Sequence, residues 1–134
     1  MPQKCVLVVD DDADSRLICR ELLTHHGYCV LEADNGADGI KQAIEASPDL
    51  VIVDLRLPGI DGMDVVRTLR AANPTADTPI VLYTADAIRS RQYMQAEEIA
   101  GLLIKPCPTA RIMHEVERLI GEGRREADRR SQLR

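Results

Sequence analysis

The stretch DLVIVDLRLPGIDGM, residues 49–63, decides the fold. Its four consecutive apolar residues, Leu50 to Val53, predict a strand that is buried on both faces, as strands of a parallel sheet are. The run then stops on a carboxylate, Asp54, before a segment of turn residues. A carboxylate at the end of a buried strand needs a structural reason, and the rest of the chain supplies one.

Short apolar runs alternate with helix-like segments five times along the chain. The fourth helical segment, residues 87–98, is polar and only weakly amphipathic. This alternation predicts an α/β fold: a (βα)5 chain with a doubly wound, parallel, five-stranded sheet, helices on both faces and right-handed connections. The predicted strands are residues 5–9, 28–33, 50–53, 80–83 and 102–104.

Length and composition predict one domain with its own core. The chain has 134 residues, of which 45% are hydrophobic and 29% are charged. We expect this domain to span residues 1–121. Residues 122–134 are polar and rich in Arg, with almost nothing apolar to pack, and they predict a tail that is either an extension of the last helix or a linker.

The charge of the chain argues against nucleic acid as a direct partner. Net charge is -5, and the last fourteen residues carry five Arg against three acidic residues, which leaves 12 basic and 19 acidic residues before them. A body that is so acidic repels a phosphate backbone. No segment resembles a signal peptide or a membrane span, and the four cysteines lack metal-ligand spacing, so we expect a cytoplasmic protein without a membrane partner.

Polar residues follow four of the five predicted strands. They are Asp10, Asp11 and Asp12 after the first, Asp54 after the third, Thr84 after the fourth and Lys105 after the fifth. The carboxyl ends of parallel strands share one edge of the sheet, where ligands bind at the point at which strand order reverses. Carboxylates about 4 Å apart repel each other by about 4 kcal/mol at an effective dielectric constant of about 20. We therefore expect Lys105 and a divalent cation to balance them, and all-oxygen ligation suits Mg²⁺, with Mn²⁺ also possible.

The same groups suit phosphoryl transfer onto Asp54. Its carboxylate is the nucleophile, and the three phosphoryl oxygens each find a partner in the cation, the Lys105 ammonium, and the Thr84 hydroxyl with nearby backbone amides.

Four motifs, in this order and spacing, resemble the receiver domain of two-component response regulators. The similarity spans residues 4–120, and its motifs are VLVVDDD, VIVDLRLPGIDGMDV, LYTA and LLIKP. It implies the flavodoxin-like receiver fold and a role in bacterial two-component or phosphorelay signalling rather than an enzyme. Asp54 is then the acceptor of phosphate from a histidine kinase or a histidine phosphotransfer protein.

The resemblance also implies roles for the residues around Asp54. Asp11 would bind Mg²⁺ directly and Asp10 largely through water, with Asp54 and the main-chain carbonyl of Arg56 completing the protein ligands. Thr84 and Lys105 would bind the phosphoryl oxygens.

Further implications concern the neighbours of these residues and the output. Ala85 would stay small to admit the phosphoryl group, and the Lys105-Pro106 bond would be cis. Asp12 is either a helix N-cap or an outer group of the site. The output would be a changed affinity for a downstream protein, which binds the face formed by the fourth helix, the fifth strand and the fifth helix.

Two positions depart from the family pattern. Leu102 stands where most receivers have an aromatic residue, and Cys107 replaces a common phenylalanine. The usual switch, in which a ring moves with the Thr hydroxyl, cannot work in its common form without that ring. Either a leucine repacks, or Tyr83 or Tyr93 takes over, or signalling depends on the loop after the fourth strand.

Arg56 and Asp86 lie two residues beyond Asp54 and Thr84. In the receiver family, the residues at these two positions flank the path of the attacking water. An ion pair between them would hinder water and slow self-dephosphorylation, and an unchanged decay rate in Arg56→Ala would contradict this. The alternative is a solvated pair worth at most about 1 kcal/mol.

Parts of the sequence also resemble patterns of three other functions. Asp10 and Asp12 have the D-x-D spacing of haloacid-dehalogenase-type phosphatases, but that class needs a late acidic pair where Pro106-Cys107-Pro108 stands. A flavodoxin-like nucleotide binder needs an anion-attracting loop after the first strand, where three aspartates repel phosphate. A receiver-like docking module with little phosphorylation-dependent switching is kept open by Leu102.

Overall fold

Five parallel strands form one sheet. The computed structural model describes the backbone of residues 3–132 and the side chains of residues 3–121. Within this range the strand order is β2-β1-β3-β4-β5, so the order reverses at β1 and confirms the predicted doubly wound sheet. The strands are β1 (Cys5–Val9), β2 (Cys29–Ala33), β3 (Leu50–Val53), β4 (Ile80–Thr84) and β5 (Gly101–Ile104).

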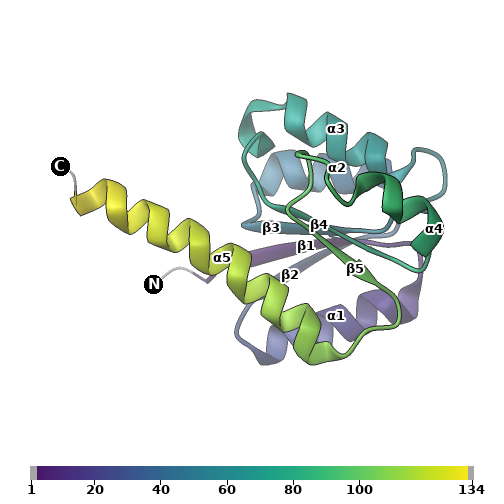
Figure 1. Ribbon diagram of the computed structural model, residues 1–134, viewed down its shortest axis with the longest axis horizontal. Helices are drawn as coiled ribbons and strands as arrows, with labels where there is room; N and C mark the ends of the chain where they lie inside the picture. The colour runs from purple at the N-terminus through teal and green to yellow at the C-terminus, as the bar shows by residue number, and fades with distance from the viewer. Residues whose placement is uncertain (1–2, 133–134) are drawn as a thin grey trace.

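Helices cover both faces of this sheet (Figure 1). α1 and α5 lie on one face, and α2 and α3 lie on the other. Two short 3₁₀ turns, η1 (Asn73–Thr75) and η2 (Arg91–Tyr93), follow α3 and α4. The helices are α1 (Ala13–His25), α2 (Gly36–Ala46), α3 (Gly62–Ala71), α4 (Ala87–Ser90) and α5 (Thr109–Gln132).

The central strands are buried on both faces because helices pack on each side. Along β1, Val6 and Val8 contact the core beneath α1 and α5, while Leu7 and Val9 contact the core beneath α2 and α3. All four residues of β3 are buried, as predicted. This double packing fixes the strand ends, and with them the polar residues that follow.

Acidic side chains cap three of the helices that follow strand ends, namely α1, α3 and α4. The Asp12 carboxylate caps α1 by accepting the Asp14 N–H, so Asp12 takes the cap role of the two left open for it. The Asp61 carboxylate caps α3, and the Asp64 carboxylate accepts a hydrogen bond from the Asp61 N–H, which completes a capping box.

The fourth helix is much shorter than predicted. The sequence predicts a helix over residues 87–98, but α4 ends at Ser90 and continues only as η2. Within this segment Ser90 alone is buried, while the side chains of Ile88 and Met94 are 81% and 67% exposed. No apolar face holds a long helix against the sheet, and an isolated helical turn has little stability of its own.

The last helix extends past the predicted domain boundary. α5 continues to Gln132, and its second half projects away from the body (Figure 1). Residues 133–134 of the predicted tail lie outside the described residues, and the boundary at residue 121 stays a prediction. No helix in the described part of the chain has the length and apolar character needed to cross a bilayer.

Candidate functional site

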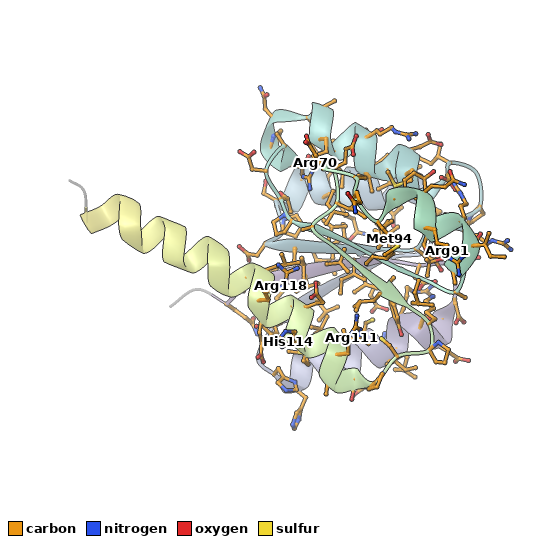
Figure 2. The ribbon with its side chains drawn as sticks, viewed as in Figure 1. Arg70, Arg91, Met94, Arg111, His114 and Arg118 are labelled. Atoms are coloured by element: carbon orange, nitrogen blue, oxygen red, sulfur yellow. The ribbon has the colours of Figure 1, made fainter. Side chains whose placement is uncertain are left out.

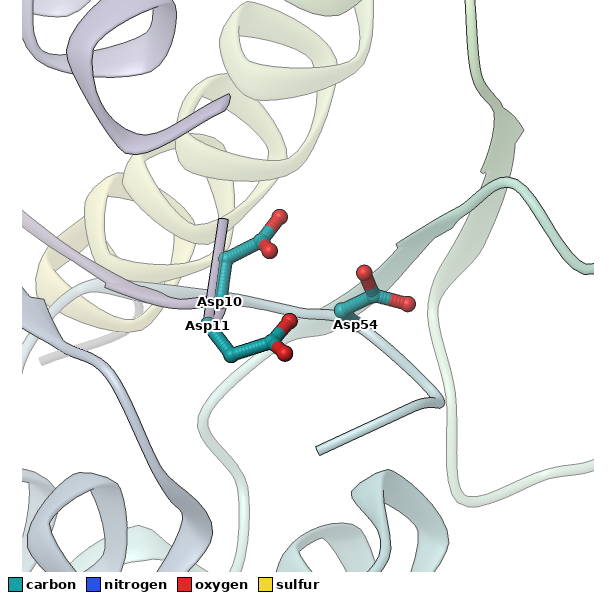
Figure 3. Close-up of side chains that lie close together, drawn as sticks. All are labelled: Asp10, Asp11 and Asp54. Atoms are coloured by element: carbon teal, nitrogen blue, oxygen red, sulfur yellow. The ribbon is translucent and has the colours of Figure 1, made fainter. Parts of the chain in front are cut away.

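Three carboxylates meet where β1 and β3 end side by side (Figure 3). Asp10 and Asp54 follow these neighbouring strands and are 2% and 8% exposed, while Asp11 is exposed. One oxygen from each of the three lies within 4.8 Å of the others. The predicted convergence of strand-end carboxylates is thus present in the fold.

Lys105 reaches this cluster from the end of β5. Its Nζ lies 2.6 Å from Asp10 Oδ2 and 3.0 Å from Asp54 Oδ2, so one ammonium joins both buried carboxylates. Burial opposes the charge on Lys105, but the hydrogen bonds and charges of the two carboxylates outweigh it and raise the pKa of the ammonium. Burial also raises the pKa of Asp10, because desolvation outweighs the favourable contact with Lys105.

The donor set fits a hard divalent cation. Three carboxylates face one ammonium, which leaves two negative charges to balance. Oxygen donors of this kind suit Mg²⁺, which keeps several waters and takes few protein ligands. At Arg56 the main-chain N–H donates to Asp54 Oδ1 at 3.2 Å, and the role of its carbonyl as a metal ligand stays a prediction.

A cleft opens beside Asp54, between the loops that follow β3 and β4. Thr84 ends β4, is 1% exposed, and accepts the Asp86 N–H on its hydroxyl at 3.2 Å. The Arg56 Nε donates to Asp86 Oδ2 at 3.1 Å, so the predicted ion pair across the cleft is present. The cleft is lined by Asp54, Arg56, Thr84, Ala85, Asp86, Ala87 and Ile88.

The aromatic residues named as substitutes for the missing ring lie on opposite faces of the sheet. Tyr83 packs in the core beneath α1 and α5, where burial raises its pKa to about 12 and Lys105 Nζ lies 5.1 Å from its ring centroid. Tyr93 packs with Leu102 against the core beneath α2 and α3. Cys107 packs against the same core as Tyr83, and burial raises the pKa of its thiol.

One ion pair near the site was not predicted. The Arg89 guanidinium on α4 binds both carboxylate oxygens of Asp61 at the start of α3, with Nη1 2.6 Å from Oδ1. Two sequence signals existed, since residues 61–64 have the spacing of a capping box and Arg89 lies three residues after the α4 cap, Asp86. Neither signal shows that the two loops meet.

The predicted cis bond between Lys105 and Pro106 is present.

A comparison with protein families decides which class of site this is. The family described as the response regulator receiver domain matches residues 6–117. The chain belongs to this family. As a receiver domain of two-component response regulators, it is a phosphoacceptor signalling domain, and its family favours this function over the phosphatase and nucleotide-binding alternatives.

Two curated proteins are similar to this chain, and each is matched over part of its length. The transcriptional regulatory protein ResD of Bacillus subtilis is 34% identical over 118 residues, which cover 86% of this chain and 47% of ResD. Protein PilH of Pseudomonas aeruginosa is 34% identical over 79 residues, which cover 59% of this chain and 65% of PilH. The receiver chain thus spans between about half and two thirds of these relatives.

Solved receiver structures share the fold over most of the chain. The chemotaxis protein CheY4 of Vibrio cholerae has a TM-score of 0.81 and 27% identity, covering 88% of this chain and 99% of CheY4. The receiver domain of the sensor histidine kinase PA1611 from Pseudomonas aeruginosa has a TM-score of 0.82 and 28% identity, covering 90% and 99%. That structure holds a magnesium ion in its active site cleft.

Proposed function

We propose that Asp54 is the phosphoacceptor of this receiver and that phosphorylation requires Mg²⁺. The observation that carries the proposal is the position of Asp54, a nearly buried strand-end carboxylate whose Oδ2 lies 3.0 Å from Lys105 Nζ beside two further carboxylates. Asp10, Asp11, Asp54 and the Arg56 carbonyl hold the cation, with Mn²⁺ as a possible substitute. When bound, it offsets the charge of the carboxylates and of the incoming phosphoryl group.

The transfer is a displacement at phosphorus. An Asp54 carboxylate oxygen forms a new bond to phosphorus while the bond from phosphorus to the donor nitrogen breaks, and the donor imidazole keeps that electron pair and takes a proton. Lys105 and the Thr84 hydroxyl bind the phosphoryl oxygens, on which charge accumulates. The product is an acyl phosphate on Asp54 and a free histidine on the donor.

The partners follow from this chemistry. The donor is a histidine kinase or a histidine phosphotransfer protein, and the output is a changed affinity for a downstream protein on the face formed by α4, β5 and α5. This proposal is supported by the position of α4, whose residues line the cleft beside Asp54. The working domain is residues 1–121, residues 122–134 extend from it, and the setting is cytoplasmic, without nucleic acid or membrane as a direct partner.

Intact mass spectrometry tests the proposal. Wild type and Asp54→Asn are incubated with acetyl phosphate, with and without Mg²⁺, beside a receiver of known activity as the donor control. We expect a single Mg²⁺-dependent phosphoryl adduct on the wild type and none on Asp54→Asn. No adduct, with the donor control working, would favour the docking module. An adduct that survives in Asp54→Asn and is lost in Asp10→Asn would favour the phosphatase.

A further inference from the structure

The ion pair between Arg89 and Asp61 joins two elements that flank the cleft. Both guanidinium Nη atoms of Arg89 bind the Asp61 carboxylate, and the two side chains are 32% and 29% exposed. Arg89 also lies near Tyr93 in η2 and interacts with its side chain. We call these contacts of Arg89 with Asp61 and Tyr93 the Arg89 latch. The latch ties α4 and η2 to the start of α3.

A chain of hydrogen bonds connects the Arg89 latch to the phosphoryl-binding residues. The Asp86 N–H donates to the Thr84 hydroxyl at 3.2 Å, and the Asp86 carboxylate accepts the Arg89 N–H at 3.0 Å. The same carboxylate accepts from Arg56, whose main-chain N–H donates to Asp54. Two hydrogen bonds therefore connect Thr84 to Arg89, and one connects Asp86 to Arg89.

The residue that links Thr84 to the outer face in most receivers lacks its ring here. Leu102 has neither a ring nor a hydroxyl that follows Thr84, and it packs together with Tyr93 against the core beneath α2 and α3. Arg89 in turn interacts with the Tyr93 side chain. Leu102 therefore cannot couple Thr84 to the surface at α4 and η2, whereas the hydrogen bonds through Asp86 and Arg89 connect Thr84 to that surface.

We propose that Arg89 is the positioning residue that couples Asp54 to the α4 surface: the Arg89 latch is closed while Asp54 is unmodified and opens when Asp54 carries a phosphoryl group. The inference rests on the proposed function of Asp54. A phosphoryl group puts about two negative charges where the Asp54 carboxylate carried one, and it draws Arg56 and the Thr84 hydroxyl toward itself. Asp86 then loses a partner and moves, and Arg89 leaves Asp61. Only the closed state contains the ion pair, so its strength sets the balance of the two states.

Beryllium fluoride, an analogue of the phosphoryl group, gives an equilibrium test. If the open state binds the analogue better, weakening the Arg89 latch must tighten that binding, because coupling between two sites is reciprocal. Asp61→Asn removes the charge and keeps an N-cap oxygen, and Arg89→Gln removes the partner. Asp64→Asn is the matched control, because Asp64 lies in the same capping box and has no described contact with Arg89. The second readout is the methyl resonance of Met94, which is exposed beyond α4 and labelled in Figure 2.

We expect Asp61→Asn and Arg89→Gln each to bind beryllium fluoride with Mg²⁺ up to about fivefold more tightly than wild type, since an exposed ion pair is worth up to about 1 kcal/mol. In both unmodified variants the Met94 methyl resonance should shift toward its position in the wild-type complex. The double variant should match either single variant, since both remove the same contact. Asp64→Asn should keep the wild-type affinity and Met94 resonance, even where its melting temperature falls.

Two results would overturn the role of Arg89. One is a wild-type affinity and Met94 resonance in Asp61→Asn and Arg89→Gln, and the other is an equal response of Asp61→Asn and Asp64→Asn. A third result would instead contradict the proposed function of Asp54. If the wild type neither binds beryllium fluoride nor gains a phosphoryl adduct from acetyl phosphate, the Asp54 proposal fails, and the coupling through Arg89 fails with it.

Discussion

Lys105 is shared between two carboxylates that come from neighbouring strands. Its Nζ contacts both Asp10 and Asp54, and the exposed fractions of the three side chains are 15%, 3% and 10%. Removing the ammonium leaves two nearly buried carboxylates without their main compensating charge. The loss of one partner from a buried pair is more costly than the pair itself is stabilising.

We therefore expect Lys105→Met to lower the free energy of unfolding by about 2–3 kcal/mol, with part of the loss recovered on adding Mg²⁺, because the cation then balances the carboxylates. Urea denaturation with and without Mg²⁺ measures both effects. Lys4→Met is the matched control, since Lys4 pairs with Asp49 at 3.7 Å and both side chains are more than a third exposed. Equal stability of the two variants would contradict the shared role of Lys105.

The residues of the site divide clearly into those the sequence predicts and those it does not. Asp10, Asp54, Thr84 and Lys105 each follow a predicted strand, and parallel strands end at one edge, so their convergence could be predicted from order alone. Arg89 could not be placed in this way. It lies in a segment whose path depends on packing against the loop before α3. No local sequence pattern predicts its contact with Asp61 in that loop.

Gly62 fixes the loop that carries Asp54, at the scale of the element. A Cβ at this position would lie 2.1 Å from the Asp54 carbonyl oxygen, and the Gly62 N–H donates to the Leu55 carbonyl at 2.9 Å. The obstacle is backbone rather than a flexible side chain, so α3 can begin this close to β3 only with glycine.

Gly62→Ala should lower the free energy of unfolding by about 1–3 kcal/mol, as overpacking does, and should slow phosphorylation by acetyl phosphate, because the Asp54 backbone must move. Thermal unfolding and the rate of adduct formation test the two effects. Gly121→Ala provides the comparison, since a Cβ there meets nothing within 4 Å and lies in a helix. A fully active Gly62→Ala protein with wild-type stability would rule out the close approach.

The attachment of α4 to α3 should depend on pH. Burial acts to raise the pKa of Asp61, but the Arg89 hydrogen bonds and the Met63 N–H outweigh it, so the pKa lies below the usual 3.8. A lowered pKa in the folded state gives stability that is present above the unfolded value and is lost as the pH falls through the folded value.

At pH 7 we therefore expect Asp61→Asn to be less stable than wild type by up to about 1 kcal/mol, and the difference should disappear on acidification below the ordinary carboxyl pKa of 3.8. Chemical denaturation at a series of pH values measures the difference. A gap that stays constant down to the lowest pH would show that the Asp61 charge does not contribute.

The length of α4 could not be predicted from local sequence patterns. The spacing of residues in segment 87–98 permits a helix, and its start was correctly predicted, but only Ser90 is buried within it. Helices in proteins are stabilised chiefly by packing of an apolar face. The exposed positions of Ile88 and Met94 show that this face is missing, which the sequence hints at only through weak amphipathicity.

At the scale of the whole molecule, alternation of apolar runs and helical segments was enough to predict the layers and the parallel sheet. The extent of α5 was not predictable, because its polar second half has no apolar spacing to indicate where the helix ends. Its described core contacts come from the first half, where Ile112, Met113, Val116, Leu119 and Ile120 are buried.

A chain that ends at Gly121 should therefore keep the melting temperature of the full chain within a few degrees and bind beryllium fluoride with the same affinity. Calorimetry and the titration described above test this boundary. A chain that ends at Ala110 is the contrasting variant, since it lacks all five buried residues of α5 and should not fold. A large loss of stability on ending at Gly121 would place the boundary further along the helix.

Chemical trapping can locate the residue that carries the phosphoryl group, which we propose is Asp54. Borohydride reduces an acyl phosphate to an alcohol, so treatment of freshly phosphorylated protein converts the modified aspartate to homoserine, which peptide mass spectrometry locates. We expect homoserine at position 54, in the stretch of residues 49–63, only when Mg²⁺ was present. Homoserine at Asp10 or Asp11, or none despite a phosphoryl adduct in the intact mass, would contradict this proposal.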